Sequence, residues 1–129
     1  MDHEQKSIRD FMLAGNQTVR IKPTTDVTSQ EKLLRIKLMT SELSELIDAI
    51  ANDDLIEIAD GIADLIYVVK GTALTYGIDI EPIFNEVQRS NMSKCIDGKL
   101  IKDASGKVMK PDTYSPPQLF PILDEQKDN

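Results

Sequence analysis

The sequence predicts an all-α fold that ends in a short β-hairpin and a Pro-rich tail. Long segments place apolar residues at helical spacing, and clusters of Gly, Pro, Asn and Asp separate them. Hydrophobic residues make up 40% of the chain and aromatic residues only 5%, so the core is expected to be aliphatic. A chain of 129 residues is most simply one domain. Its expected parts are an N-terminal helix and loop (1–28), core helices (29–93), and hairpin and tail (94–129).

Two helices are expected in the N-terminal part of the chain. The first covers about residues 2–14, and the segment GNQTVRIKPTTD after it is expected to be a loop. The second begins after Thr28, because TSQE matches a capping box in which the Thr28 hydroxyl accepts a hydrogen bond from the backbone at Glu31. This helix runs to about Ala51, and its apolar surface is wider than a single stripe.

The third helix is expected to start at Asp53 or Asp54, either of which can cap it, and to reach about Tyr76, where Gly77 ends it. Apolar residues surround nearly the whole of this helix, and such helices are normally buried on several sides. One chain of this size has little material to cover it. We therefore expect partner subunits.

The C-terminal part is expected to hold one more helix, followed by extended chain. The helix starts near DIEP, where Pro82 suits the first turn, and runs to about Ser93. The segment GKLIKDASGKVMK predicts a short hairpin around Ser105 and Gly106. The Pro-rich PDTYSPPQLFP is expected to be extended, and the final DEQKDN to be frayed.

The stretch SELSELIDAIANDDLIEIADGIADLIYVV carries eight carboxylates among Leu and Ile, and no Lys or Arg. Glu42 and Glu45 are three residues apart on the second expected helix, and Glu57 and Asp60 are three apart on the third. At ~100° per residue each pair falls on one helix face, and Asp64 shares the face of the second pair. The short connection predicts antiparallel helices, so the two pairs are expected to meet at similar height.

Carboxylates that converge in an apolar groove repel one another unless a proton or a cation compensates their charge. Clustered oxygen ligands favour Mg²⁺ or Mn²⁺. The candidate metal ligands are Glu42, Glu45, Glu57 and Asp60. Asp64 is a further ligand, a residue that orients one, or a polar contact in the bundle. The competing interpretation is that the pairs are solvated surface acids, although a surface helix normally interleaves basic partners.

Charge and composition disfavour several classes of protein. The net charge of −7 argues against binding to a nucleic-acid polymer or an anionic membrane. Between residues 87 and 110, six basic residues stand against two acids, which suits a metal-bound polyanion or simply a solvated basic loop. A polar N-terminus, a single cysteine and no apolar run long enough to cross a bilayer make a cytoplasmic protein the default.

SELSEL followed by EIAD resembles the metal-binding signature of the all-α nucleoside triphosphate pyrophosphohydrolases, which include MazG-like enzymes and phosphoribosyl-ATP pyrophosphohydrolase. That signature is Glu-Glu-x-x-Glu on one helix and Glu-x-x-Asp on the next. Glu42 and Glu45 match its second and third Glu, and Ser41 replaces the first. Glu57 and Asp60 match its second half. NEVQRSNMSK resembles the segment after the metal helices in the phosphoribosyl-ATP-pyrophosphohydrolase-like branch, where Asn and Lys face the substrate.

The resemblance implies helix hairpins that pair across subunits into four-helix bundles, as a homodimer or a homotetramer. It also implies hydrolysis between the α and β phosphates of a nucleotide, releasing a monophosphate and pyrophosphate. House-cleaning of nucleotides is favoured over phosphoribosyl-ATP hydrolysis, because the N-terminal loop and the C-terminal hairpin add material around a nucleotide pocket. The alternative from another class is a non-catalytic metal- and nucleotide-binding helical assembly module, which Ser41 favours.

The expected roles of single residues follow from their chemistry. Either Glu42 or Glu45 is expected to orient the attacking water, with no basis for choosing between them. The substrate-binding candidates share polar or aromatic side chains and lie outside the acidic stretch: Phe11 and Gln17 for the base, Asn91 for sugar or phosphate, and Arg89 and Lys94 for phosphate oxygens. The alternative for the last three is a helix C-terminus that simply favours cations.

Overall fold

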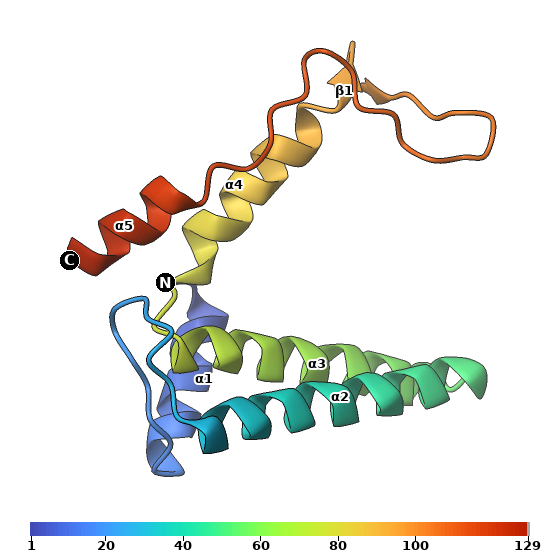
Figure 1. Ribbon diagram of the computed structural model, residues 1–129. Helices are drawn as coiled ribbons and strands as arrows, with labels where there is room; N and C mark the ends of the chain where they lie inside the picture. Colours follow the sequence, from blue (N-terminus) through green and yellow to red (C-terminus); the bar gives the residue numbers. More distant parts are fainter. Residues whose placement is uncertain (129) are drawn as a thin grey trace. The chain divides into compact units, whose positions relative to one another are not determined.

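The structure is a computed structural model that describes residues 1–128 in two compact units, Met1–Ile80 and Glu81–Asp128 (Figure 1). Five α-helices and two short strands lie within these residues, which confirms the predicted all-α class with its small antiparallel hairpin. No helix within residues 1–128 combines the length and the apolar composition needed to cross a membrane. The expected single-domain organisation stays a prediction.

The first two helices begin where their capping residues predict. Helix α1 spans His3–Ala14, and the Asp2 side chain accepts a hydrogen bond from the backbone of its first turn at 2.7 Å. Helix α2 spans Ser29–Ala51, and the Thr28 hydroxyl accepts from the Glu31 N–H at 3.1 Å. Each cap satisfies a backbone donor that the helix itself leaves unpaired.

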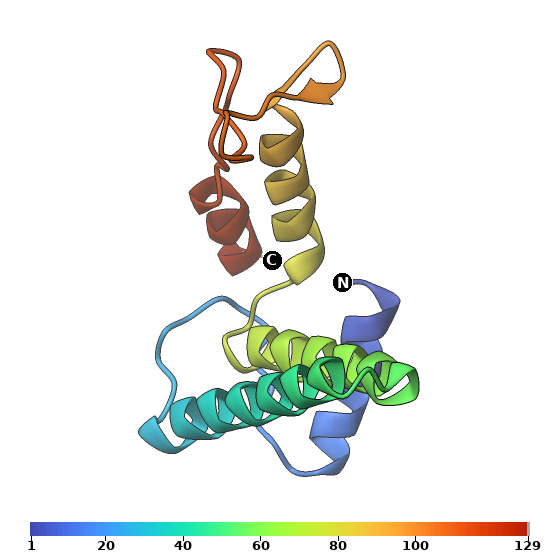
Figure 2. The ribbon, with the colours of Figure 1, turned by 90° about the vertical axis from the view of Figure 1, so that its right-hand side faces the viewer.

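Helices α2 and α3 form an antiparallel hairpin, seen as two long helices side by side in Figures 1 and 2. Helix α3 spans Leu55–Thr75, and Asp54 caps it by accepting from the Glu57 N–H at 3.2 Å. Gly61 allows the two helices to approach closely, because a Cβ at that position would lie 3.2 Å from the Leu46 Cα. A larger residue there would push the helices apart.

Gly77 ends α3, as the sequence predicts. Its φ of +71° lies in the left-handed region that favours glycine, and a Cβ at this position would collide with the backbone of Lys22. The loop after α1 therefore runs against the end of α3. A hydrogen bond from the Thr24 N–H to the Tyr76 carbonyl, at 3.0 Å, holds the two segments together.

The hydrophobic core of the first unit is small. Ile8 and Met12 of α1 pack with Leu74 of α3, and none of these three side chains is more than 3% exposed. Most large apolar side chains of α2 and α3 are exposed in the single chain. Ten of them are called the aliphatic surface from here on: Leu33, Ile36, Leu43, Ile47, Ile50, Leu55, Ile56, Ile62, Ile66 and Val69.

Four elements make up the second unit: α4 (Ile80–Met92), β1 (Cys95–Ile96), β2 (Lys99–Leu100) and α5 (Phe120–Asp128). Helix α4 begins one residue before the start of this unit. The paired strands lie earlier than predicted, on either side of Asp97 and Gly98, whose φ values are +50° and +76°. Asp-Gly is a strong signal for a two-residue hairpin turn, because both central residues need positive φ. Around residues 105–106, where the sequence predicts the hairpin, the structure has an isolated bridge between Lys102 and Val108.

The final segment is helical up to Asp128, so the expectation that it is frayed is wrong for the described residues; Asn129 lies outside them. Figures 1 and 2 show α5 alongside α4. The Glu86 carboxylate of α4 accepts hydrogen bonds from the Gln118 N–H at 2.7 Å and from Arg89 at 2.8 Å. The segment that leads into α5 is thus bonded to α4, a contact that its composition does not reveal.

Candidate functional site

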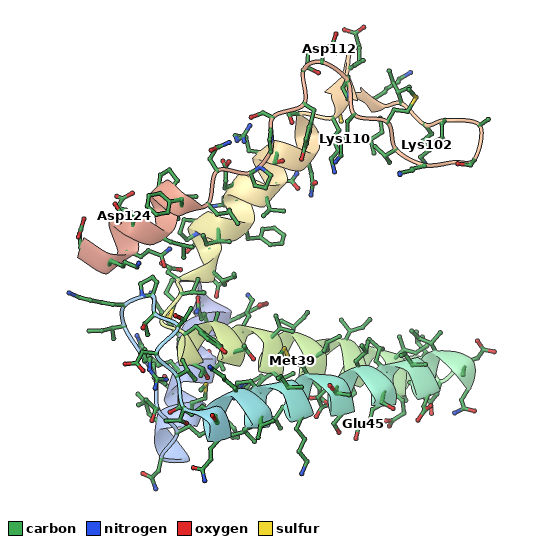
Figure 3. All side chains as sticks on the ribbon, in the orientation of Figure 1. Met39, Glu45, Lys102, Lys110, Asp112 and Asp124 are labelled. Carbon is green, nitrogen blue, oxygen red and sulfur yellow. The ribbon has the colours of Figure 1, made fainter. Side chains whose placement is uncertain are left out.

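Four carboxylates interact across the α2–α3 hairpin, and they are called the acid quartet: Glu42 and Glu45 of α2, and Asp60 and Asp64 of α3. Members on the same helix lie about one turn apart, and the antiparallel pairing brings the two turns to similar height. Figure 3 labels Glu45 on α2, on the connection side of Met39. The sequence predicts that Glu57 and Asp60 face Glu42 and Glu45, whereas the α3 acids that interact with Glu42 and Glu45 are Asp60 and Asp64.

Glu42 is the member of the quartet whose charge is least well compensated. It is partly buried, and its Oε2 atom has no hydrogen-bond partner among the described residues. Burial raises the pKa of the Glu42 carboxyl, and Glu45, Asp64 and Asp60 raise it further. A carboxylate oxygen shielded from water among like charges is a group that a bound cation would stabilise.

Asp64 belongs to the quartet, whereas Glu57 lies beside it. Burial raises the pKa of the Asp64 carboxyl, and the nearby Asp60 and Glu45 add to the rise. Glu57 instead shares with Glu45 the lining of an open hollow of about 390 Å³ near the α2–α3 connection. The sequence left the role of Asp64 open, and its electrostatic environment now groups it with the other three acids. The role of Glu57 as a ligand stays a prediction.

The quartet does not close into a coordination shell. Among residues 1–128, no group of three or more Asp, Glu, His or Cys side chains lies in an arrangement that could hold a metal ion. The chemistry of the quartet nevertheless fits a hard divalent cation, because all its donors are carboxylate oxygens. The orphaned Oε2 of Glu42 points to the same kind of ligand, because in the described chain it has nothing to accept from.

The two candidates for base binding, Phe11 and Gln17, lie in the first unit, in different surroundings. The Phe11 ring packs edge-to-face on Tyr67, with ring centroids 5.6 Å apart. Gln17 lines a cavity of about 180 Å³, from which Phe11 is absent. The Gln17 Oε1 atom accepts a hydrogen bond from Arg35 at 3.4 Å.

Arg35 is a buried residue that the sequence reasoning missed. Its side chain sits between α2 and α3, where Nε donates to the Thr72 hydroxyl at 3.1 Å and Nη2 to the Val68 carbonyl at 2.9 Å. Gly71 leaves room for it, because a Cβ there would lie 2.6 Å from Nη2. A signal existed in the sequence: Arg35 precedes Glu42 by seven residues, so the two share a face of α2.

Arg89, Asn91 and Lys94 lie in the second unit, on α4 and just after it. Arg89 donates to both carboxylate oxygens of Glu86 at 2.8 Å, so its guanidinium already has an acidic partner. Lys94 contacts neutral groups: Nζ donates to the Asn91 Oδ1 at 3.2 Å and lies 5.7 Å from the Tyr114 ring centroid. Lys94 is therefore freer than Arg89 to bind an anion.

Comparison with known proteins agrees with this chemistry. A family model for phosphoribosyl-ATP pyrophosphohydrolase matches residues 9–91, a range that includes α2, α3 and the whole acid quartet. Uncharacterized protein L479 of Acanthamoeba polyphaga mimivirus is 38% identical over 56 residues, which is 43% of this chain and 22% of that protein. The match therefore spans less than a quarter of that relative. The chain belongs to the phosphoribosyl-ATP pyrophosphohydrolase family, within the MazG-like all-α NTP pyrophosphohydrolase superfamily.

Proposed function

We propose that this protein hydrolyses the bond between the α and β phosphates of a nucleoside triphosphate in a Mg²⁺-dependent, house-cleaning reaction. The products are a nucleoside monophosphate and pyrophosphate. Family membership supports a nucleotide pyrophosphohydrolase activity, and MazG-like pyrophosphohydrolases generally use divalent metals. The observation that carries the proposal is the acid quartet, in which the buried Oε2 of Glu42 has no hydrogen-bond partner among the described residues.

In this proposal Glu42, Glu45, Glu57 and Asp60 hold the cation. Asp64 serves as a further ligand or orients one of the others. When bound, Mg²⁺, or Mn²⁺ in its place, would neutralise negative charge on the triphosphate. Either Glu42 or Glu45 is proposed to orient the attacking water.

The nucleotide is the proposed partner of the remaining candidates. Gln17 and Phe11 are proposed contacts for the base, and Phe11 is 61% exposed. Lys94 and Asn91 are proposed contacts for phosphate or sugar oxygens. Arg89 is the weakest of these assignments, because a phosphate would have to compete with the Glu86 carboxylate for its guanidinium.

Two alternatives compete with this function. Phosphoribosyl-ATP hydrolysis is the reaction in the family's description, and it differs from the proposal in its substrate alone. A non-catalytic metal- and nucleotide-binding module is favoured by Ser41, which stands where the family signature has its first Glu. The second alternative predicts nucleotide binding without pyrophosphate release.

We also propose that a second copy of this chain covers the aliphatic surface, giving a homodimer or a homotetramer. Ten large aliphatic side chains are exposed on two neighbouring helices, and Leu55 and Ile56 are each more than 75% exposed. A monomeric soluble protein rarely leaves so many large aliphatic side chains of two neighbouring helices in water. The molar mass of the protein, measured by light scattering as it elutes from a size-exclusion column, would test this proposal. A monomer at micromolar concentration would contradict it.

The function is tested by supplying a panel of nucleoside triphosphates and phosphoribosyl-ATP, with and without Mg²⁺ or Mn²⁺, and detecting released pyrophosphate. The proposal predicts metal-dependent release from at least one nucleoside triphosphate. Asp60→Asn should abolish this release. Asp124→Asn is its matched control, because it removes an exposed carboxylate of α5 that lies outside the acid quartet. Pyrophosphate release from phosphoribosyl-ATP alone would favour phosphoribosyl-ATP hydrolysis. Nucleotide binding without pyrophosphate release would favour the non-catalytic module.

A further inference from the structure

The second unit concentrates positive charge between residues 94 and 110. The basic side chains there are Lys94, Lys99, Lys102, Lys107 and Lys110. None of these lysines forms an ion pair with an acid among residues 1–128, although the chain carries a net charge of −7. The nearby Asp103 carboxylate instead accepts hydrogen bonds from the Ser105 hydroxyl at 2.6 Å and from the Lys107 backbone N–H at 3.0 Å. The ammonium groups therefore keep their charge uncompensated.

Two of the five lysines converge on one aromatic ring. The Lys94 Nζ atom lies 5.7 Å from the centroid of the Tyr114 ring, and the Lys110 Nζ atom lies 5.1 Å from it. By these two distances the nitrogen atoms are at most ~11 Å apart. The ring attracts each cation, whereas the two cations repel each other. The fold thus brings two ammonium groups together without a counter-charge.

Hydrogen bonds to the end of α4 fix the backbone on both sides of Tyr114. The Thr113 hydroxyl donates to the Ser93 carbonyl at 3.3 Å, and the Ser115 N–H donates to the Ser93 hydroxyl at 2.8 Å. Lys94 directly follows Ser93 in the chain. The same short segment therefore anchors the ring and carries the first lysine.

Lys110 reaches the ring from a backbone that is also hydrogen-bonded, and Figure 3 labels it on the chain that returns past the end of α4. The Met109 N–H before it donates to the Ile101 carbonyl at 2.8 Å. The Pro111 carbonyl after it accepts from the Tyr114 N–H at 2.9 Å. Lys110 is thus held between two bonded neighbours, one of which is bonded to the residue that carries the ring.

Both ammonium groups keep donors for a ligand. Each has three N–H groups. Lys94 uses one of them on the Asn91 Oδ1 at 3.2 Å, and Lys110 donates to no residue among 1–128. Lys94 is half-buried and Lys110 is exposed, so an ion from solvent can reach both. Lysine binds phosphate as a point charge, and two lysines complement an anion that carries more than one negative charge.

We propose that Lys94 and Lys110 form a binding site for a diphosphate group, with Tyr114 as the positioning residue that holds the two ammonium groups together. A diphosphate carries several negative charges and is longer than a single phosphate, so its two ends can reach two separate cations. This group occurs both at the end of a nucleoside triphosphate and as free pyrophosphate. The inference rests on the proposed function for the choice of phosphate, and it adds Lys110 and Tyr114 to the residues that handle it.

Calorimetry with inorganic pyrophosphate, on the whole chain in EDTA, tests the site without metal and without turnover. Lys94→Gln and Lys110→Gln should each weaken binding by about fivefold or more, because each variant loses a charge and its hydrogen bonds to the anion. Lys107→Gln is the matched control: it removes one positive charge from an exposed lysine of the same stretch that does not contact the Tyr114 ring. It should change the affinity by less than about twofold.

The role of the ring is tested without changing any charge. Tyr114→Leu should weaken pyrophosphate binding, because the two ammonium groups lose the ring that holds them, whereas Tyr114→Phe keeps the ring and should bind as the wild type does. Pyrophosphate that fails to bind the wild type at millimolar concentration would overturn the inference. So would equal weakening by Lys107→Gln and Lys110→Gln, or wild-type affinity in Tyr114→Leu.

Two further measurements distinguish the sources of the diphosphate group. If the site holds the end of the substrate, Lys110→Gln should raise KM for a nucleoside triphosphate and leave binding of the monophosphate unchanged. If it holds the released product, the variant should weaken inhibition by pyrophosphate at an unchanged KM. Pyrophosphate binding that depends on both lysines, in a protein that hydrolyses no nucleotide, would refute the proposed function and support the site. Nucleotide hydrolysis together with pyrophosphate binding that is independent of both lysines would do the reverse.

Discussion

Replacing Glu42 by Gln should stabilise the metal-free protein. The substitution removes the charge whose Oε2 atom is buried without a partner, and it relieves repulsion from the three other acids of the quartet. An unsatisfied buried polar group costs ~1–3 kcal/mol. Because Glu42 is only partly buried, solvent screening reduces the expected gain to ~1 kcal/mol, or about 3 °C in Tm for a chain of this size.

The sign of this effect depends on pH and on metal. Because the folded protein raises the pKa of the Glu42 carboxyl above its ordinary 4.5, the repulsive cost is absent below pH 4.5 and complete above the raised value. The Tm difference between Glu42→Gln and wild type should therefore shrink as the pH falls towards 4.5. With Mg²⁺ added at pH 7.5, the wild type should gain more stability than the variant, because binding to the folded state stabilises it.

The assay is thermal unfolding followed by circular dichroism, at pH 7.5 and pH 4.5, in EDTA and in Mg²⁺. Asp124→Asn again serves as the control, with no change expected in any condition. A Glu42→Gln variant that melts below the wild type in EDTA at pH 7.5 would refute the reasoning about the quartet. Equal gains from Mg²⁺ in variant and wild type would refute the assignment of Glu42 as a ligand.

Three further substitutions test other parts of the account. Asp60→Asn should abolish Mg²⁺-dependent pyrophosphate release while the helical circular dichroism signal stays intact, and residual turnover would contradict the site. Gly77→Ala should lower Tm by several degrees more than Gly98→Ala. Each variant should lose ~1 kcal/mol of stability because alanine disfavours a positive φ, but a Cβ at Gly98 meets no atom within 4 Å. Equal losses in Tm would argue against the contact at Gly77. Glu86→Gln should speed amide exchange in α5 at neutral pH, because Arg89 holds the pKa of Glu86 at about 2, and the ion pair is therefore complete above pH 4.5. Unchanged exchange would show that Glu86 does not anchor α5.

The helices could be predicted from sequence because their limits depend on local chemistry. Thr28 and Asp54 mark helix starts through side-chain caps, and Gly77 marks an end through its positive φ. The hairpin was misplaced although Asp97 and Gly98 carried the stronger turn signal. The helical tail was not foreseen, and the chain just before it is bonded to α4 through Gln118 and Glu86, a tertiary contact that the sequence of the tail does not show.

The sequence predicted that acids of two helices come together, but not which acids of α3 do so. Spacing placed Glu57 and Asp64 on one face of α3, yet helix periodicity does not say which carboxylate reaches the acids of α2. Asp64 does so and Glu57 lies beside the hollow near the connection. Arg35 shares a face of α2 with Glu42, but its burial depends on Gly71 leaving space on the facing helix, a tertiary relation that the pattern of α2 alone does not contain.

The central claim is that the acid quartet and its neighbouring carboxylate bind a divalent cation. Mn²⁺ titrated into the protein and followed by electron paramagnetic resonance, which reports the free ion, tests it most directly. The account predicts saturable binding to the wild type and to Asp124→Asn, and its loss in Asp60→Asn. Mn²⁺ that stays free in the presence of wild-type protein, or that binds Asp60→Asn equally well, would contradict it.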